Sequence, residues 1–143
     1  MRLPGRPAVR ILIVDGEAEA RDALMAILGS AGKDVHALDN FLDGARALMR
    51  EEFHLLVLDC HQSGLPCQTV LSLLREVAPS VPVVLTTMDP EGQDAARWTQ
   101  AGVFRVLGKP FNRAEVLDAV ERARAFRGAA PPPPTRLTSP PAP

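Results

Sequence analysis

The stretch His54-Leu55-Leu56-Val57-Leu58-Asp59 decides the fold of this 143-residue chain. Its short, unbroken aliphatic run is typical of a strand that is buried on both faces, as in a parallel sheet. The run ends in Asp59, and a loop over residues 60–66 follows it. Because ligands and chemistry collect at the carboxyl ends of strands in open α/β sheets, Asp59 is the first candidate functional residue.

Four other segments have the length of strands, and the first of them is rich in β-branched residues. They cover residues 9–14, 33–38, 81–87 and 103–107. The second of these alternates only weakly between apolar and polar residues, which favours a place near the sheet edge. Pro82 is acceptable only near the start of its strand.

Five segments are expected to be helices, over residues 18–28, 41–50, 66–77, 91–101 and 112–127; four of them carry apolar residues at helical spacing, and the segment over 91–101 is short and rather polar. Strands that alternate with helices predict βαβ units and an α/β fold, a doubly wound five-stranded parallel sheet. The residues expected to face the core are, helix by helix, Ala20, Ala23, Leu24, Ile27 and Leu28; Ala45, Leu48 and Met49; Val70, Leu71, Leu73 and Leu74; and Val116, Leu117, Val120 and Ala123.

Composition indicates one domain and excludes several classes of protein. Hydrophobic residues make up 46% of the chain and charged residues 23%, as in ordinary globular proteins. A net charge of -1 gives no reason to expect nucleic acid or a membrane as a partner. Without a long apolar run or a signal-peptide core, we expect a cytoplasmic location. In that location Cys60 and Cys67 are expected to be free thiols.

The ends of the chain differ in composition from its middle. Seven of the 14 prolines lie within residues 131–143, where no apolar periodicity remains. Such a segment cannot bury enough surface to fold. We therefore expect an N-terminal extension over residues 1–7, a folded domain over 8–128 and a Pro-rich disordered tail over 129–143.

Polar residues follow four of the expected strands and should meet at one edge of the sheet. They are Asp15, Asp59, Thr87 and Lys109. Two adjacent carboxylates repel each other and require a cation, either Lys109 or a hard divalent metal such as Mg²⁺. A carboxylate can attack phosphorus, while a lysine and a hydroxyl bind phosphate oxygens. This set therefore favours phosphoryl transfer.

These motifs resemble the receiver domain of two-component response regulators over about residues 8–127. The matching segments are Ile11-Leu12-Ile13-Val14-Asp15, Leu55-Leu56-Val57-Leu58-Asp59, Pro82-Val83-Val84-Leu85-Thr86-Thr87 and Lys109-Pro110-Phe111. The resemblance implies the (βα)5 flavodoxin-like receiver fold, with Asp59 as phosphoacceptor, Lys109 as the phosphate-pairing lysine and Thr87 as the switch hydroxyl. It also implies Mg²⁺ and a histidine kinase or phosphotransfer protein as the phosphoryl donor. Thr86 competes with Thr87 for the switch role, but the spacing to Lys109 favours Thr87.

The chain departs from the family pattern at several positions. Gly16 replaces the second of two adjacent acids, and Glu17 occupies a position that usually points away from the pocket. The loop carries Gln62-Ser63 and Pro66-Cys67 in place of the usual residues, and Val106 replaces the switch aromatic.

Magnesium is the cofactor that the resemblance implies. Its expected ligands are Asp15, Asp59 and the backbone carbonyl of His61. Gly16 stands where the family has a carboxylate that binds the metal directly, so we expect weakened Mg²⁺ affinity, by at least about 10–100-fold. The spacing of His54, Cys60, His61 and Cys67 matches no common zinc pattern.

The first hypothesis is a single-domain receiver that serves as a signalling switch or phosphorelay protein. It is not an enzyme beyond self-catalysed phosphoryl transfer and autodephosphorylation at Asp59. Arg105 and Val106 would lie on its partner surface, toward a downstream protein, and the chain would be a monomer or weak homodimer. The alternative is a degenerate pseudo-receiver that binds partners independently of phosphorylation. A small flavodoxin-like or hydrolytic enzyme is disfavoured, because no phosphate-cradling glycine loop and no Gly-x-Ser-x-Gly elbow is present.

Overall fold

The computed structural model describes residues 9–62 and 64–126. The expected N-terminal extension, Ser63 and the Pro-rich tail lie outside the described residues. Within them, five strands form one sheet: β1 (Arg10–Val14), β2 (Asp34–Leu38), β3 (Leu55–Leu58), β4 (Val83–Thr87) and β5 (Arg105–Gly108). The helices are α1 (Ala18–Ser30), α2 (Phe41–Arg50), α3 (Cys67–Val77), α4 (Gln93–Gln100) and α5 (Arg113–Phe126), with a 3-10 turn, η1 (Cys60–Gln62), after β3.

The sheet is parallel throughout, in the order β2-β1-β3-β4-β5. The prediction of a doubly wound (βα)5 fold is confirmed, and so is the edge position of β2. The central strand β3 is buried along its whole length. Its aliphatic residues contact helices on both faces, which explains why the run shows no alternation.

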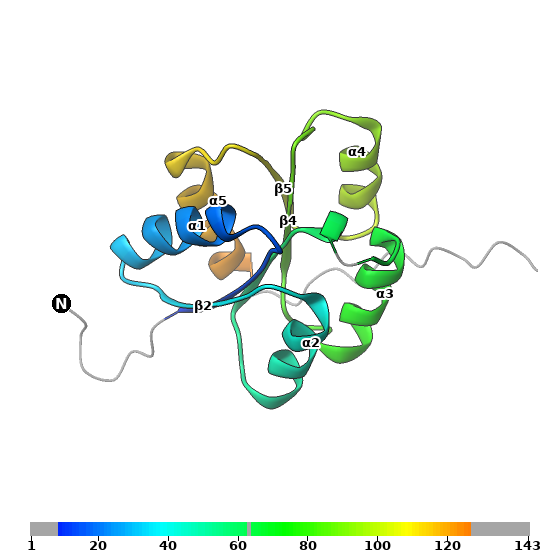
Figure 1. The fold of residues 1–143 in the computed structure, drawn as a ribbon, viewed down its shortest axis with the longest axis horizontal. Coiled ribbons are helices and arrows are strands. Elements are labelled where there is room, and N and C mark those ends of the chain that lie inside the picture. The colour runs from blue at the N-terminus through cyan, green and yellow to red at the C-terminus, as the bar shows by residue number, and fades with distance from the viewer. Residues whose placement is uncertain (1–8, 63, 127–143) are drawn as a thin grey trace, which may run out of the picture.

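Two hydrophobic clusters fill the space on the two sides of the sheet. One side of the sheet packs against α1 and α5, and the other packs against α2 and α3 (Figure 1). Alternate residues of each strand contribute to alternate clusters, since Ile11 and Ile13 belong to the first and Leu12 and Val14 to the second. Figure 1 also shows α4 above α3, beside β4 and β5.

Three apolar residues that we expected to face the core are exposed: Ala23, Met49 and Leu73. On α2 the buried residues are Gly44 and Leu48, one turn apart. Met49 lies about 100° further round that helix and is 71% exposed. The helices therefore bury narrower stripes than the count of apolar residues suggested.

Candidate functional site: an acidic pocket at the carboxyl edge

The register of β1 and β3 places two carboxylates side by side. Val14 and Leu58 are paired at the ends of these strands. The amide of Asp59 then donates to the carbonyl oxygen of Val14 at 2.9 Å, which fixes the direction of the chain as it leaves β3. Asp15 and Asp59 are both buried, at 2% and 6% exposure. The predicted proximity of the two acids is confirmed.

The register of β4 and β5 brings the hydroxyl and the ammonium group to the same edge. Thr87 pairs with Gly108, and the amide of Lys109 donates to the carbonyl oxygen of Thr87 at 2.8 Å. The peptide bond between Lys109 and Pro110 is cis. All four residues that the sequence placed at this edge therefore lie there.

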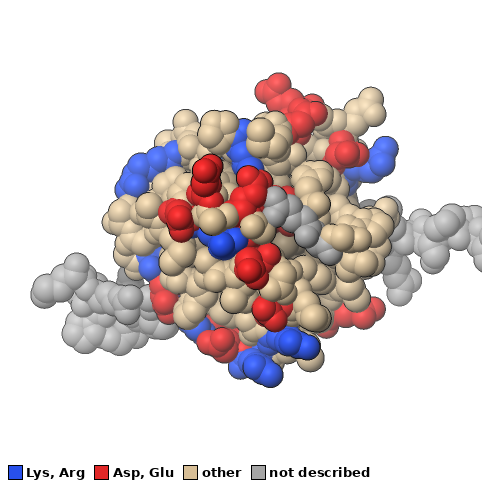
Figure 2. Space-filling view, viewed as in Figure 1, with Lys and Arg blue, Asp and Glu red and all other residues tan. Residues whose placement is uncertain are grey.

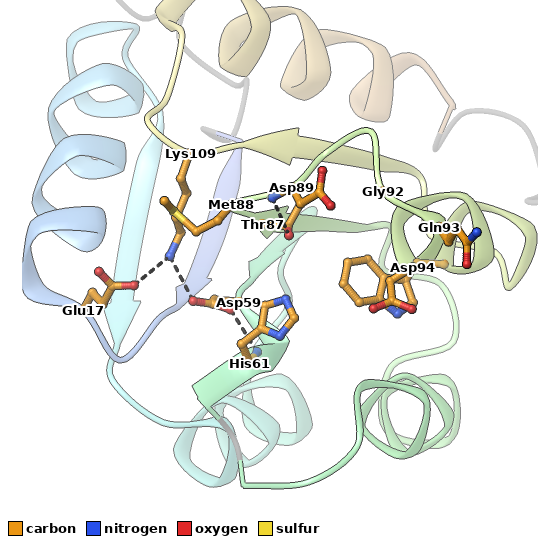
Figure 3. A pocket seen from close by; sticks show the side chains of 11 residues that line it. Glu17, Asp59, His61, Thr87, Met88, Asp89, Gly92, Gln93, Asp94 and Lys109 are labelled. Carbon is orange, nitrogen blue, oxygen red and sulfur yellow. Dashed lines mark hydrogen bonds and ion pairs between the residues drawn. The ribbon is translucent and has the colours of Figure 1, made fainter.

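Lys109 is the cation that the buried acids require, and Figure 3 shows its ammonium group between Asp59 and Glu17. Its Nζ lies 2.8 Å from Oδ2 of Asp15 and 2.9 Å from Oδ2 of Asp59. Burial by itself lowers the pKa of Lys109. The hydrogen bonds and negative charges of the two carboxylates raise this pKa by more than burial lowers it, so the pKa of Lys109 lies above its usual value. The ammonium group is therefore charged throughout the physiological range.

Glu17 faces the pocket, and the expectation that it points away is wrong. Its amide donates to Oδ1 of Asp15 at 2.8 Å, and this hydrogen bond closes a short turn that directs the chain over the site. Its Oε1 lies 3.3 Å from Nζ of Lys109, although its side chain is 53% exposed. The side chain is long enough to reach inward from its position after Gly16. Sequence reasoning missed this residue, and its only signal was that it is the next acid after the missing one.

The two threonines at the end of β4 have different surroundings. The hydroxyl of Thr87 lines the pocket and accepts a hydrogen bond from the amide of Asp89 at 3.1 Å. Thr86 is buried, and its hydroxyl has no hydrogen-bond partner in the part of the chain that the structure describes. Position in the pocket therefore favours Thr87 for any contact with a ligand at Asp59.

The pocket above Asp59 has a volume of about 500 Å³. Its far wall comes from the β4–α4 segment and α4, and includes Met88, Asp89 and Trp98, which sequence reasoning did not assign. The ring of Trp98 lies 5.7 Å from that of His61, with the planes at 61°. Figure 2 shows acidic side chains gathered around a basic one near the middle of the visible face.

His61 supports Asp59 through its backbone. Its amide donates to Oδ1 of Asp59 at 2.9 Å, and Lys109 binds Oδ2 of the same carboxylate. The two oxygens are therefore held from two directions (Figure 3). The expected contribution of its carbonyl to metal binding stays a prediction.

Cys60 and Cys67 form a disulfide, so the prediction of free thiols is wrong. The 3-10 turn folds the loop back on itself, and the two Cα atoms lie 5.2 Å apart, within the usual range for a disulfide. Sequence reasoning assigned the thiols from the expected compartment and did not consider this geometry.

Arg105 and Val106, the expected partner surface, are half-buried on β5. Val106 packs against the second hydrophobic cluster. The guanidinium of Arg105 donates to Oδ2 of Asp118 at 2.8 Å, and Arg122 donates to the same oxygen at 2.9 Å. The hydrogen bonds from Arg105 and then Arg122 hold the pKa of Asp118 below its usual value.

The donor set suits a hard divalent cation. Carboxylate oxygens of Asp15, Glu17 and Asp59 all lie within 4.8 Å of one another. Hard oxygen ligands of this kind are those that Mg²⁺ prefers. One buried acid beside a lysine, a hydroxyl and a cation site is a set of groups suited to phosphoryl transfer.

The chain belongs to the response regulator receiver domain family, whose model matches residues 11–121. It is 29% identical over 118 residues to the transcriptional regulatory protein GlrR of Escherichia coli (strain K12), covering 82% of this chain and 26% of that protein. It is 30% identical over 115 residues to the response regulator protein FleR of Pseudomonas aeruginosa, covering 80% of this chain and 24% of that protein. The chain thus spans about a quarter of the length of these relatives.

Solved structures share the fold. The receiver domain of a sensor histidine kinase from Pseudomonas aeruginosa PAO1 has a TM-score of 0.73 and 25% identity, and the match covers 83% of this chain and 99% of that one. That structure holds a magnesium ion coordinated in its active-site cleft. The chain is accordingly a receiver domain of the two-component systems. None of the helices among the described residues is long and apolar enough to cross a membrane.

Proposed function

We propose that Asp59 accepts a phosphoryl group from a histidine kinase or a phosphotransfer protein, and that the chain acts as a signalling switch or relay. The observation that carries this proposal is the environment of the Asp59 carboxylate. One oxygen is bonded to the His61 amide and the other to Lys109, at the base of an open pocket. The carboxylate is therefore held in one orientation, and a phosphoryl donor can also approach it through the pocket.

The neighbouring groups have distinct roles in this proposal. Lys109 pairs with an oxygen of the incoming phosphoryl group and offsets the charge that develops on it. The Thr87 hydroxyl exchanges its bond with the Asp89 amide for a bond to the phosphoryl group, which draws the β4–α4 segment inward. Phosphorylation adds roughly 1.5–2 negative charges, enough to shift a pre-existing equilibrium of that segment.

Mg²⁺ is held by Asp15, Asp59 and Glu17, with the His61 carbonyl, in this proposal. When bound, it neutralises charge on the transferring phosphoryl group. Gly16 supplies no ligand, so the affinity stays weaker than two adjacent acids would give. Glu17 offsets part of that loss because its carboxylate already faces the other two.

The output surface in this proposal is the face made by α4, β5 and α5. It presents Arg105 and Val106 to a downstream protein, in the cytoplasm, with the chain as a monomer or weak homodimer. The receiver comprises residues 8–128, flanked by the extension and the Pro-rich tail. Beyond self-catalysed phosphoryl transfer and autodephosphorylation, no enzymatic activity is proposed.

Acetyl phosphate with Mg²⁺ tests the proposal directly. The intact mass should increase by one phosphoryl group in the wild type and in Asp22→Asn, a control at an exposed position of α1. Asp59→Asn should show no increase. A wild-type chain that gains no mass at millimolar reagent, and whose fluorescence does not respond to beryllofluoride, would remove the phosphoacceptor assignment.

A pseudo-receiver is the second candidate function. Lys109 pairs with both buried carboxylates, and the Thr87 hydroxyl already accepts a hydrogen bond from the Asp89 amide. A pocket whose polar groups pair with one another in this way supports a stable binding module. This version predicts that Asp59→Ala leaves partner binding unchanged.

A further inference from the structure

The cysteine pair encloses the loop that follows the phosphoacceptor. Cys60 comes directly after Asp59, and Cys67 is the first residue of α3, seven positions later. Their disulfide ties the end of the central strand to the beginning of the next helix. Both ends of the loop are thereby fixed in relation to the sheet.

The enclosed loop supports the site at two points. The His61 amide holds Oδ1 of Asp59 at 2.9 Å, and the His61 ring contacts Trp98 on α4. His61 also lines the pocket. Freedom gained by this loop would therefore loosen a hydrogen bond to the acceptor carboxylate.

The two cysteines differ in exposure and in chemistry. Cys60 is 2% exposed, whereas Cys67 is half-buried. Cys67 also begins an 11-residue helix, where the helix dipole stabilises a thiolate. An external thiol can reach the Cys67 sulfur first, and Cys67 is a good leaving thiolate afterwards.

We propose that Cys60–Cys67 is a thiol–disulfide exchange site through which a dithiol reductant controls Mg²⁺ binding and phosphoryl acceptance at Asp59. A thiolate of the reductant attacks the sulfur of Cys67, the S–S bond breaks, and Cys60 leaves with the electron pair and takes a proton. In the mixed disulfide that results, the second thiolate of the reductant attacks the reductant sulfur that is bonded to Cys67. The Cys67 thiolate is released and also takes a proton. The cysteines gain two electrons and two protons, and the dithiol becomes a disulfide.

Reduction lowers Mg²⁺ affinity and slows phosphorylation in this proposal. The His61 amide is an outer partner of an expected metal ligand, and the loss of such partners commonly costs about tenfold or more in affinity. The phosphorylation effect rests on the function proposed above. The Mg²⁺ effect rests on the metal site proposed there and does not depend on phosphorylation.

The test compares the full chain oxidised with oxidised glutathione and reduced with dithiothreitol. Alkylation and intact mass establish zero or two free thiols in each sample. Calorimetric titration with Mg²⁺ and the rate of mass gain with acetyl phosphate are then measured. We expect affinity and rate to fall about tenfold on reduction. Cys67→Ser should match the reduced wild type and show no further response to dithiothreitol, which separates the loop effect from other effects of the reagent.

Equal Mg²⁺ affinities in the two redox states would overturn the inference. So would a pair that oxidised glutathione cannot join while the chain stays folded. If neither state accepts a phosphoryl group, the phosphoacceptor proposal fails, whereas the Mg²⁺ titrations still decide this one.

Discussion

Replacing Glu17 by glutamine tests whether this residue compensates for Gly16. The substitution keeps the shape of the side chain and its hydrogen-bonding oxygen but removes the charge. Because the Glu17 amide, not its side chain, holds Oδ1 of Asp15, the local turn should be preserved. We expect weaker Mg²⁺ binding with an unchanged fold.

The structure gives the size of the effect. Two oxygens on opposite sides of one Mg²⁺ lie about 4.2 Å apart, and the three carboxylates already lie within 4.8 Å of one another. Two unit charges about 4 Å apart interact by ~1 kcal/mol in water, so a divalent ion at that distance interacts with one carboxylate by ~2 kcal/mol, which is a lower bound for a carboxylate bound directly at about 2.1 Å. The high dielectric constant is appropriate because the Glu17 side chain is 53% exposed. The dissociation constant should therefore rise at least about 30-fold.

Calorimetric titration with Mg²⁺ at constant ionic strength provides the measurement. The matched control is Glu19→Gln, in the first turn of α1 and outside the carboxylate group. It should bind Mg²⁺ within about twofold of the wild type, since bulk charge at a distance is screened. If the two variants weakened binding equally, the effect would be general electrostatics and Glu17 would not be a ligand.

Four further substitutions test the pocket, the packing and the acid stability, with Gly29→Ala as the control for Gly44→Ala. Lys109→Met should tighten Mg²⁺ binding by about tenfold or more in titrations, because the three carboxylates lose the cation that competes with the metal. The same substitution should slow phosphoryl transfer from acetyl phosphate, measured by intact mass. Weaker Mg²⁺ binding would contradict the idea that Lys109 competes with the metal. Gly44→Ala places a Cβ 2.6 Å from a methyl group of Val14 and should lower the free energy of urea unfolding by about 1 kcal/mol, whereas Gly29→Ala, which meets nothing within 4 Å, should raise it by up to about 1 kcal/mol. Because the pKa of Asp118 is lowered in the folded state, this carboxylate stabilises the fold above its unfolded pKa of about 3.9, and the stabilisation is lost as pH falls through the folded pKa. Asp118→Asn should therefore flatten the acid side of a plot of the urea unfolding midpoint against pH. An unaltered plot would exclude this ion pair as a source of acid sensitivity.

Local sequence was enough for the parts of the fold that depend on local pattern. The run ending in Asp59 predicted a central buried strand, because a strand covered on both faces has no polar face to show. The positions of Asp15, Thr87 and Lys109 followed from the same rule, since parallel strands deliver their carboxyl ends to one edge. Their convergence around Asp59 required only the topology.

The direction of individual side chains was not available from the sequence. Met49 satisfied the apolar periodicity of α2 but is exposed, because α2 buries only a narrow stripe. Glu17 lies in the pocket because the turn at Asp15 and the length of its side chain bring it to Lys109. Neither outcome is encoded in spacing alone.

The sequence by itself determined the strand and helix order, the parallel sheet and the edge at which the polar residues gather, because these depend on hydrophobic period and chain connectivity. Only the tertiary structure decided that a third carboxylate joins the site and that Cys60 pairs with Cys67. Both depend on how a loop turns after a strand ends, which is set by contacts with neighbouring strands and helices. The chemistry of the pocket is therefore specified at two levels, with its residues chosen by pattern and its geometry by packing.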